Sequence, residues 1–219
     1  MPTITFKKSS MNQPSISFAT TVWNEHEEIN RLLTQLLSLL GPNDEIVIQG
    51  DQGKVTNAVV STLHRFVKNP QVKYIEYPLR KNFATYKNNL FKYCECEYIF
   101  NIDADEFLSD TLANNFCSVL VENPDIEMFR IPRINVVEGI TPEYVSKWRW
   151  NLDADNWVNF PDYQCRIVKN GCATWKNPVH EILSGYSTTA DFPADPFWAL
   201  VHVKSIDRQI KQNEFYSTF

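Results

Sequence analysis

The stretch YIFNIDADE, residues 98–106, is the part of the sequence that decides the fold prediction. Its first five residues are mostly apolar and predict a short buried strand. Two aspartates one residue apart, Asp103 and Asp105, follow that strand directly. Two carboxylates in this position can hold a hard divalent cation against a diphosphate. The stretch therefore predicts a strand that ends in a candidate metal site.

A second Asp-x-Asp copy occurs at residues 153–155. It lies between Asn151 and Asn156, in a polar segment that has no strand pattern in front of it. We expect this copy to form an exposed turn, because Asn and Asp favour turns. The first copy is therefore the candidate site.

Outward from residues 98–106, apolar strand patterns alternate with amphipathic helix patterns. We expect strands at 16–22, 45–49, 72–77 and 98–102, with helices after Asn24 and at 55–67, 83–93 and 109–121. This alternation predicts an α/β fold with a parallel sheet covered by helices. In such sheets, ligands bind beyond the carboxyl ends of the strands. Thr21, Asn24, Glu25 and Asp51 all lie at predicted strand ends, as Asp103 and Asp105 do.

After about residue 125 the pattern becomes mixed and rich in aromatic residues and prolines. We expect short strands at 126–131, 144–150, 164–168, 179–183 and 197–203, and a helix over 205–216. No repeat or linker divides the chain, so residues 1–219 are expected to form a single domain.

Composition excludes several classes of protein. The net charge of −5 argues against a nucleic-acid partner. The six glycines form neither G-x-G-x-x-G nor a P-loop, so phosphates need another counter-charge. No apolar run is long enough to span a membrane, and no signal peptide is evident, which predicts a cytoplasmic protein with reduced cysteines.

Several segments together resemble family 2 glycosyltransferases of the GT-A fold. They are ISFATTVWNEHEEINRLLTQL (16–36), RKNF (80–83), KNN (87–89), the stretch 98–106, QCRIV (164–168), PVHE (178–181) and WALVH (198–202). The order of these segments is similar to that in one branch of the family, which includes transferases that decorate bacterial surface polysaccharides. One departure is Gly50-Asp51-Gln52-Gly53, where the family usually has D-D-G-S.

The resemblance implies a GT-A-like, mostly parallel central sheet flanked by helices. The nucleotide-binding half would span about 15–121, and about 122–219 would form an acceptor-binding half with a C-terminal helix. The implied activity is an inverting, metal-dependent transfer of a sugar from a nucleotide-diphosphate sugar to an acceptor hydroxyl. The default donor is a UDP-sugar and the cofactor Mn²⁺ or Mg²⁺. The acceptor would be a saccharide or a lipid-linked saccharide, the latter implying peripheral association with the inner face of a membrane.

The resemblance also assigns roles to particular residues, and several of them have a simpler structural alternative. Those implied for the nucleotide sugar are Thr21, Asn24, Glu25, Asp51, Lys81, Lys87 and Asp103. Those implied for the metal are Asp103, Asp105 and His202, with Asp105 the preferred ligand. The alternatives are helix caps for Asn24 and Glu25, a turn residue for Asp51, solvated lysines, and a hydrogen-bonded core histidine.

Sugar transfer needs a general base for the acceptor hydroxyl. The acidic candidates are Glu181, Glu106 and Asp162, and we favour Glu181. Its neighbour His180 would orient the acceptor or a phosphate. The alternative for Glu181 is a structural ion pair with Arg166.

Two other functions compete with this reading. A sugar nucleotidyltransferase uses a similar sheet, but it usually has a Gly-rich, Arg-containing loop after the first strand, where this chain has residues 21–24. A catalytically inactive carbohydrate-binding module is the non-enzymatic alternative. A zinc hydrolase is disfavoured, because His180-Glu181 lacks the second histidine of H-E-x-x-H.

Overall fold

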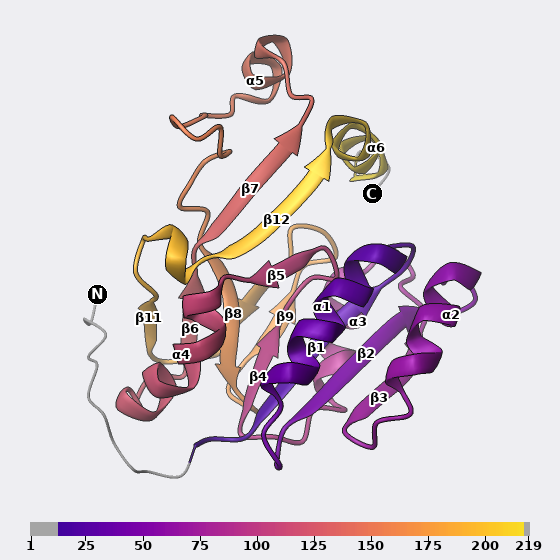
Figure 1. Ribbon diagram of the computed structural model, residues 1–219, viewed down its shortest axis with the longest axis vertical. Helices are drawn as coiled ribbons and strands as arrows, with labels where there is room; N and C mark the ends of the chain where they lie inside the picture. Colours follow the sequence, from indigo (N-terminus) through magenta and orange to yellow (C-terminus); the bar gives the residue numbers. More distant parts are fainter. Residues whose placement is uncertain (1–12, 217–219) are drawn as a thin grey trace.

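A seven-stranded sheet forms the centre of the computed structural model, which describes residues 13–216 (Figure 1). Its strands, in spatial order, are β11 (Thr189–Asp191), β6 (Met128–Ile131), β8 (Gln164–Lys169), β4 (Tyr98–Asn101), β1 (Ile16–Val22), β2 (Glu45–Asp51) and β3 (Val72–Tyr77). β8 runs antiparallel to both of its neighbours, and every other pairing is parallel. The prediction of an α/β fold with a mostly parallel sheet is confirmed.

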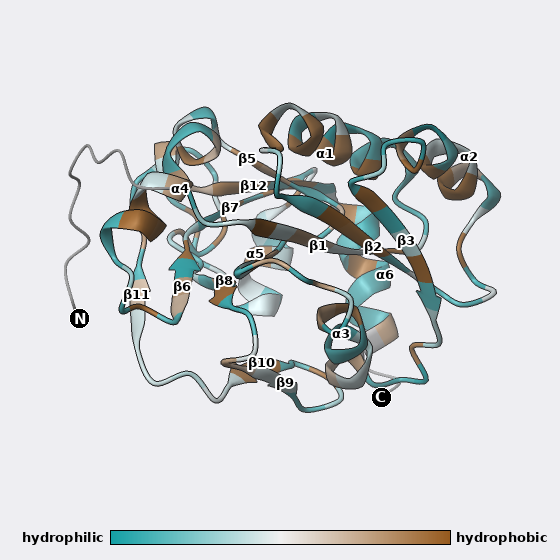
Figure 2. Ribbon diagram, turned by 90° about the horizontal axis from the view of Figure 1, so that it is seen from below, coloured by the Kyte–Doolittle hydropathy of each residue, from teal (hydrophilic) through white to brown (hydrophobic). Residues whose placement is uncertain are grey.

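Helices cover both faces of this sheet (Figure 2). α1 (His26–Leu39), α2 (Asn57–Phe66) and α4 (Asp110–Glu122) lie on one face. α3 (Phe83–Phe91) and the hairpin of β9 (Thr174–Lys176) and β10 (Ile182–Ser184) lie on the other. Alternate strand residues serve the two faces, so Phe18 packs into the first apolar cluster and Ala19 into the second.

A smaller sheet brings the late part of the chain to the end of β4. β12 (Leu200–Ser205) pairs with β5 (Glu106–Leu108) on one side and with β7 (Arg133–Glu138) on the other. The register places His202 opposite Glu106 and beside Asn135. A 3₁₀ turn (Pro196–Trp198) precedes β12, and α6 (Ile206–Tyr216) follows it directly. The smaller sheet therefore forms a wall beside the Asp-x-Asp segment.

In the second half, one strand prediction was wrong and another was right only in part. Residues 144–150 fall mostly in a helix, α5 (Pro142–Trp148), which starts with a proline in its first turn and ends at Arg149 in the left-handed conformation. Only Ile182 and Leu183 of the predicted strand 179–183 are extended in β10, because His180 has a φ of 51°. Both segments project aromatic or polar side chains rather than continuing the central sheet.

Three local expectations can be compared directly. Asn24 does not cap α1; Glu25 holds that position, without a side-chain cap hydrogen bond. The second Asp-x-Asp copy is an exposed turn, as predicted, with Asp153 Oδ1 accepting from the backbone N–H groups of Asp155 and Trp157. The five cysteines are thiols in the structure, two of them buried and three partly buried. Within residues 13–216, no helix has both the length and the apolar character that a membrane crossing requires.

Candidate active site

A cavity of about 550 Å³ opens at the carboxyl ends of β1 and β4. Its walls come from both halves of the chain, including β7, β12 and α6. Eight of the eleven residues to which a binding, metal or catalytic role was assigned from the sequence line it: Thr21, Glu25, Lys87, Asp103, Asp105, His180, Glu181 and His202. The position predicted from the strand ends is therefore where these side chains meet.

Three predicted residues do not line this cavity. Asn24 and Lys81 are exposed, and Lys81 lies in a turn with a φ of 55°. Asp51 is buried at the end of β2, where it accepts a hydrogen bond from Leu79 N–H at 2.9 Å and pairs with Lys54 at 3.2 Å. A Cβ on the preceding Gly50 would come within 2.5 Å of the Tyr74 hydroxyl. The close packing at this turn explains why glycine stands there.

The Asp-x-Asp segment forms a tight turn after β4. Ile102 N–H still bonds to Ala19 of β1, which carries the strand direction up to the first aspartate. Glu106 N–H then bonds to the Asp103 carbonyl, and the Glu106 carboxylate accepts from Asp103 N–H at 3.1 Å. This reciprocal pairing turns the side chains of Asp103 and Asp105 towards the cavity.

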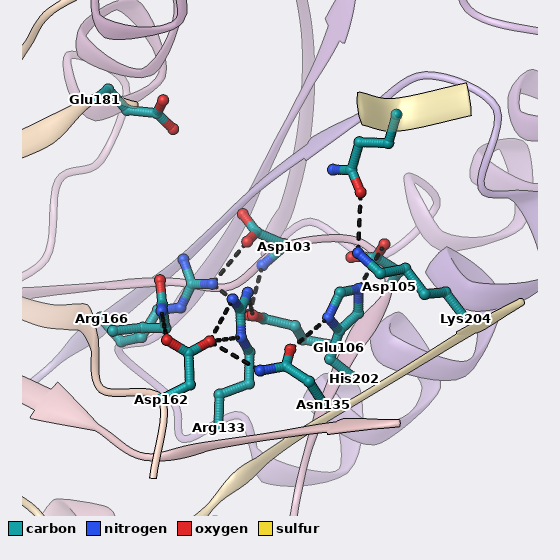
Figure 3. Close-up of polar contacts among 12 residues, drawn as sticks. Asp103, Asp105, Glu106, Arg133, Asn135, Asp162, Arg166, Glu181, His202 and Lys204 are labelled. Carbon is teal, nitrogen blue, oxygen red and sulfur yellow. Dashed lines mark hydrogen bonds and ion pairs between the residues drawn. The ribbon is translucent and has the colours of Figure 1, made fainter. Parts of the chain in front are cut away.

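Asp103 is balanced by basic residues. Arg166 donates to Asp103 Oδ2 at 2.6 Å (Figure 3). The Lys87 amine lies 3.9 Å from Asp103 Oδ1. Burial alone would raise the pKa of Asp103, but the charges of Arg166, Lys87 and Arg133 lower it well below its usual range. These partners stabilise the ionised form of Asp103 and orient its carboxylate.

Asp105 faces a different set of partners. His202 Nε2 lies 3.2 Å and an Arg208 nitrogen of α6 lies 3.3 Å from Asp105 Oδ2. Burial opposes ionisation, but the hydrogen bond to His202 and nearby positive charge lower the pKa of Asp105 to about 2. Arg208 also pairs with Glu25 at 3.2 Å and with Glu28 at 2.6 Å. Through Arg208, α6 therefore contacts one carboxylate that follows β1, Glu25, and one that follows β4, Asp105.

Two of the three candidate bases are occupied by arginines. Glu106 is fully buried and bonds to Arg166 and to Arg133, the latter at 3.1 Å. Asp162 accepts from Arg133 at 2.6 Å and from Asn135 at 2.8 Å. Burial works against it, but the charge of Arg133 lowers the pKa of Asp162. Glu106 does not line the cavity, whereas Asp162 lines it while held by Arg133 and Asn135.

Glu181 lies on the far side of Asp103 from this arginine cluster (Figure 3). It pairs with Lys87 at 2.7 Å, so the alternative ion pair with Arg166 is wrong. Arg166 is buried and committed to Asp103 and Glu106. Glu181 keeps a share of its surface open to the cavity, as does its neighbour His180.

α3 places Lys87 in this arrangement. The Asn82 side chain caps the helix by accepting from Thr85 N–H at 2.9 Å. Asn88 then exchanges two hydrogen bonds with the Trp175 backbone of β9. The Lys87 amine lies 4.6 Å above the Trp175 ring, a cation–π contact. The hairpin that carries Glu181 is thereby fixed to the helix that carries its partner.

The sequence reading missed several cavity residues that carry charge or amide groups: Arg133, Asn135, Gln164, Lys204 and Gln212. Arg208 was also missed, and Arg166 was considered only as a partner of Glu181. A charged residue inside an apolar strand pattern, as in QCRIV, was the available signal. Its partner was not predictable, since Arg166 lies 60 or more residues from Asp103 and Glu106 along the chain.

The orientation of His202 bears on whether a metal fits. Asn135 Nδ2 donates to Asp162, so the other atom of this amide, Oδ1, faces His202 Nδ1 at 2.9 Å. Asn135 Oδ1 therefore accepts a hydrogen bond from the Nδ1–H group of His202. Nε2 is the ring nitrogen that faces Asp105, at 3.2 Å. A divalent cation such as Mn²⁺ or Mg²⁺ would replace the hydrogen bond between them and take the Nε2 lone pair and the carboxylate as ligands. Within residues 13–216, however, no cluster of three or more His, Cys, Asp or Glu side chains is preassembled as a metal site.

The sheet order and the acidic turn at the end of β4 define an α/β protein of the GT-A-like class. The chain belongs to Glycosyl transferase family 2, whose sequence model matches residues 17–169. This match confirms the resemblance drawn from the sequence.

The chain is also similar in sequence to a polysaccharide synthase and in structure to TarS. A poly-beta-1,6-N-acetyl-D-glucosamine synthase of Staphylococcus epidermidis is 27% identical over 120 residues, which are 55% of this chain and 29% of the synthase. S. aureus TarS 1–349 in complex with UDP matches the structure with a TM-score of 0.61 at 12% identity, over 90% of this chain and 62% of TarS. The complex with UDP-GlcNAc gives the same TM-score at 13% identity, over 87% and 58% of the two chains. The chain thus spans under a third of the curated synthase it matches.

Proposed function

We propose that this protein transfers a sugar from a nucleotide-diphosphate sugar, by default a UDP-sugar, to an acceptor hydroxyl with inversion and with Mn²⁺ or Mg²⁺ as cofactor. One observation carries the proposal. The Asp-x-Asp carboxylates, two early strand-end residues and a separate glutamate, Glu181, line a single cavity. Family membership supports the same reaction class.

The donor half of the cavity has groups suited to a nucleotide. Thr21 and Glu25 line it at the end of β1, where a hydroxyl and a carboxylate can bond to base and ribose. The Glu25 carboxylate is held by the backbone N–H groups of Trp23 and Asn24, at 2.8 and 3.0 Å. In this proposal Asp51 supports the turn beside the base, and Lys81 attracts the donor from outside the cavity.

Asp105, with Asp103 and His202, would hold the divalent cation. When bound, that cation would neutralise charge on the diphosphate as it leaves. Asp103 Oδ2 accepts from Arg166, whereas Asp105 Oδ2 faces the His202 imidazole, a candidate second ligand, so Asp105 is the preferred carboxylate.

Glu181 would be the general base. It would take the proton of the acceptor hydroxyl while the acceptor oxygen attacks the anomeric carbon. The bond from that carbon to the diphosphate breaks, and its electron pair goes to the phosphate oxygen. Lys87 orients Glu181 through the 2.7 Å contact, and His180 would position the acceptor.

The acceptor would enter beside the aromatic segment of α5. Tyr144, Trp148 and Trp150 stack in series, with ring centroids 4.8 and 4.7 Å apart, and Trp150 lines the cavity. Aromatic faces of this kind suit sugar rings. The acceptor would be a saccharide or lipid-linked saccharide, which in the second case brings the protein to the inner face of a membrane.

A donor panel tests the proposal. The full chain is incubated with Mn²⁺ or Mg²⁺, a mixture of saccharide acceptors and a set of nucleotide sugars, and release of nucleoside diphosphate is followed. Turnover that needs both donor and metal is expected. Pyrophosphate release from a nucleoside triphosphate and a sugar phosphate would instead show a nucleotidyltransferase. Sugar binding without turnover, under all of these conditions, would show a binding module.

A further inference from the structure

Lys204 of β12 differs from the other basic residues around the cavity. Lys87, Arg133, Arg166 and Arg208 each contact at least one carboxylate. The Lys204 amine instead donates to the neutral side chain of Gln212 at 2.9 Å. Among residues 13–216, no carboxylate lies within ion-pair distance of it. Asp105 and Asp103 attract the amine from beyond that distance, but its burial outweighs their attraction, so an anionic ligand would stabilise the ammonium group.

The fold directs Lys204 into the cavity. It lies two residues after His202 on the same strand, so the two side chains share a face of the smaller sheet. Both line the cavity, and Gln212 of α6 fixes the amine from the other side. The strand and the helix together hold one positive charge ready beside the Asp-x-Asp turn (Figure 3).

The position of Lys204 relative to Glu181 indicates which substrate group it would contact. In Figure 3, Glu181 and Lys204 lie on opposite sides of Asp103, with Lys204 on the side of Asp105. An in-line displacement puts the attacking oxygen and the leaving group on opposite sides of the reacting carbon. If the acceptor is deprotonated at Glu181, the leaving group lies towards Lys204.

We propose that Lys204 binds the diphosphate of the donor and stabilises it as the leaving group. This inference rests on the proposed function and adds a phosphate-binding residue to it. The bond between the anomeric carbon and the phosphate oxygen breaks as the acceptor oxygen bonds to the carbon. The electron pair stays on the phosphate oxygen, where the Lys204 ammonium offsets the added charge, while the acceptor proton goes to Glu181.

The test compares ligands that differ only in their phosphates. Affinities of UDP, GDP, CDP and dTDP for the full chain are measured by calorimetry with Mg²⁺, and the tightest is taken forward with its nucleoside. Lys204→Met is expected to weaken binding of that diphosphate at least tenfold and to leave the nucleoside affinity within twofold. Lys204→Arg keeps the charge and is expected to stay within about threefold of wild type. Lys211→Ala, an exposed lysine of α6, is the matched control.

Each other outcome decides against the inference. Unchanged diphosphate affinity in Lys204→Met, or an equal loss for diphosphate and nucleoside, would overturn it while leaving the proposed function standing. If the wild-type chain binds none of the four diphosphates, the proposed function fails and the role of Lys204 fails with it. Circular dichroism of each variant identifies unfolding, and in that case Lys204→Gln replaces Lys204→Met.

Discussion

At the scale of single residues, three carboxylates within four positions have three different environments. Glu106 is buried between two arginines, Asp103 is held by Arg166 at one oxygen, and Asp105 faces His202 and Arg208. Each arrangement follows from which strand or helix lies opposite. The chemical role of an acidic residue in this turn is therefore set by its partners and not by its type.

Removing the proposed base should affect turnover more than binding. Glu181→Gln keeps the shape and removes the proton acceptor, so kcat should fall by roughly 10²–10⁴. Donor affinity, measured by calorimetry, should stay within about threefold. Glu143→Gln, on the exposed face of α5, is the control. A kcat reduced less than tenfold would exclude Glu181 as the base.

The two Asp-x-Asp copies should respond differently to the same change. Asp105→Asn should weaken metal-dependent nucleotide binding by at least about tenfold, or ~1.4 kcal/mol, because an amide is a poorer ligand for a hard cation. Asp153→Asn should leave it unchanged, since that aspartate lies in an exposed turn. Titration of each variant with nucleotide, with and without Mn²⁺, checks this. A loss in Asp153→Asn instead would reverse our choice of motif.

At the scale of elements, one buried carboxylate joins the first strands of the sheet. Glu45 of β2 accepts from Ser17 of β1 at 2.5 Å and from Glu95 N–H at 2.6 Å, and pairs with Lys73 of β3 at 2.8 Å. Burial opposes its charge, but these hydrogen bonds lower the pKa of Glu45. The strands are thus tied together at their amino ends, away from the cavity.

Glu45→Gln should reduce the free energy of unfolding by about 1–3 kcal/mol at pH 7, because charge-assisted hydrogen bonds are lost. A carboxyl whose folded pKa is lowered stabilises the protein above its unfolded pKa, near 4.5, and this stabilisation is lost as the pH falls through the folded value. The free energy of unfolding of Glu45→Gln should therefore fall less than that of the wild type as the pH is lowered. Urea unfolding between pH 3 and 7 measures both effects.

The matched control for this change is Glu27→Gln, whose side chain is 85% exposed. It should alter the unfolding free energy by less than about 0.5 kcal/mol at every pH. Equal behaviour of the two variants would show that the Glu45 network contributes nothing specific.

The aromatic segment of α5 provides a second element-scale prediction. Trp150→Ala should raise the acceptor KM about three- to tenfold, the equivalent of ~0.5–1.5 kcal/mol for a lost aromatic contact, and leave the donor KM unchanged. Initial rates against each substrate separate the two. Tyr93→Ala, at an exposed aromatic after α3, should change neither constant. An increase in the donor KM alone would contradict this prediction and show that Trp150 contacts the donor and not the acceptor.

At the scale of the whole molecule, the cavity joins distant parts of the chain. Thr21 comes from β1, Glu181 from the segment before β10, and His202 and Lys204 from β12. A ligand that touches all of these should stabilise the entire fold, since it binds only when they are together.

A nucleoside diphosphate with Mg²⁺ at 100 times its Kd should add about 2.7 kcal/mol to the free energy of unfolding. For a chain of this size, that corresponds to a rise in Tm of roughly 5–10 °C. Thermal unfolding followed by circular dichroism measures it, with the nucleoside alone as the control. No rise with any diphosphate would contradict a nucleotide site in the cavity.

The sequence allowed the first four strands and eight of the residues that line the cavity to be predicted, because strand and helix periods are local and strand ends gather at one edge of a parallel sheet. The sequence did not allow prediction where contacts with distant residues determine the position of a side chain or the conformation of a segment. Asp51 sits at a predicted strand end, yet its carboxylate is turned to Leu79 N–H in the next loop. The segment around Trp148 reads as a strand by its aromatic content, but Pro142 starts a helix there.

The sequence by itself determined the α/β alternation, the acidic turn after β4 and the exposed character of the second Asp-x-Asp copy. Those features depend on apolar periodicity and turn-forming residues within short windows. Only the tertiary structure decided which positive charge meets which carboxylate. The register of β12 against β5 sets His202 opposite Glu106, and α6 brings Arg208 to Asp105 from about 100 residues away. Electrostatic pairing depends on distances of a few ångströms, and separation along the chain does not determine them.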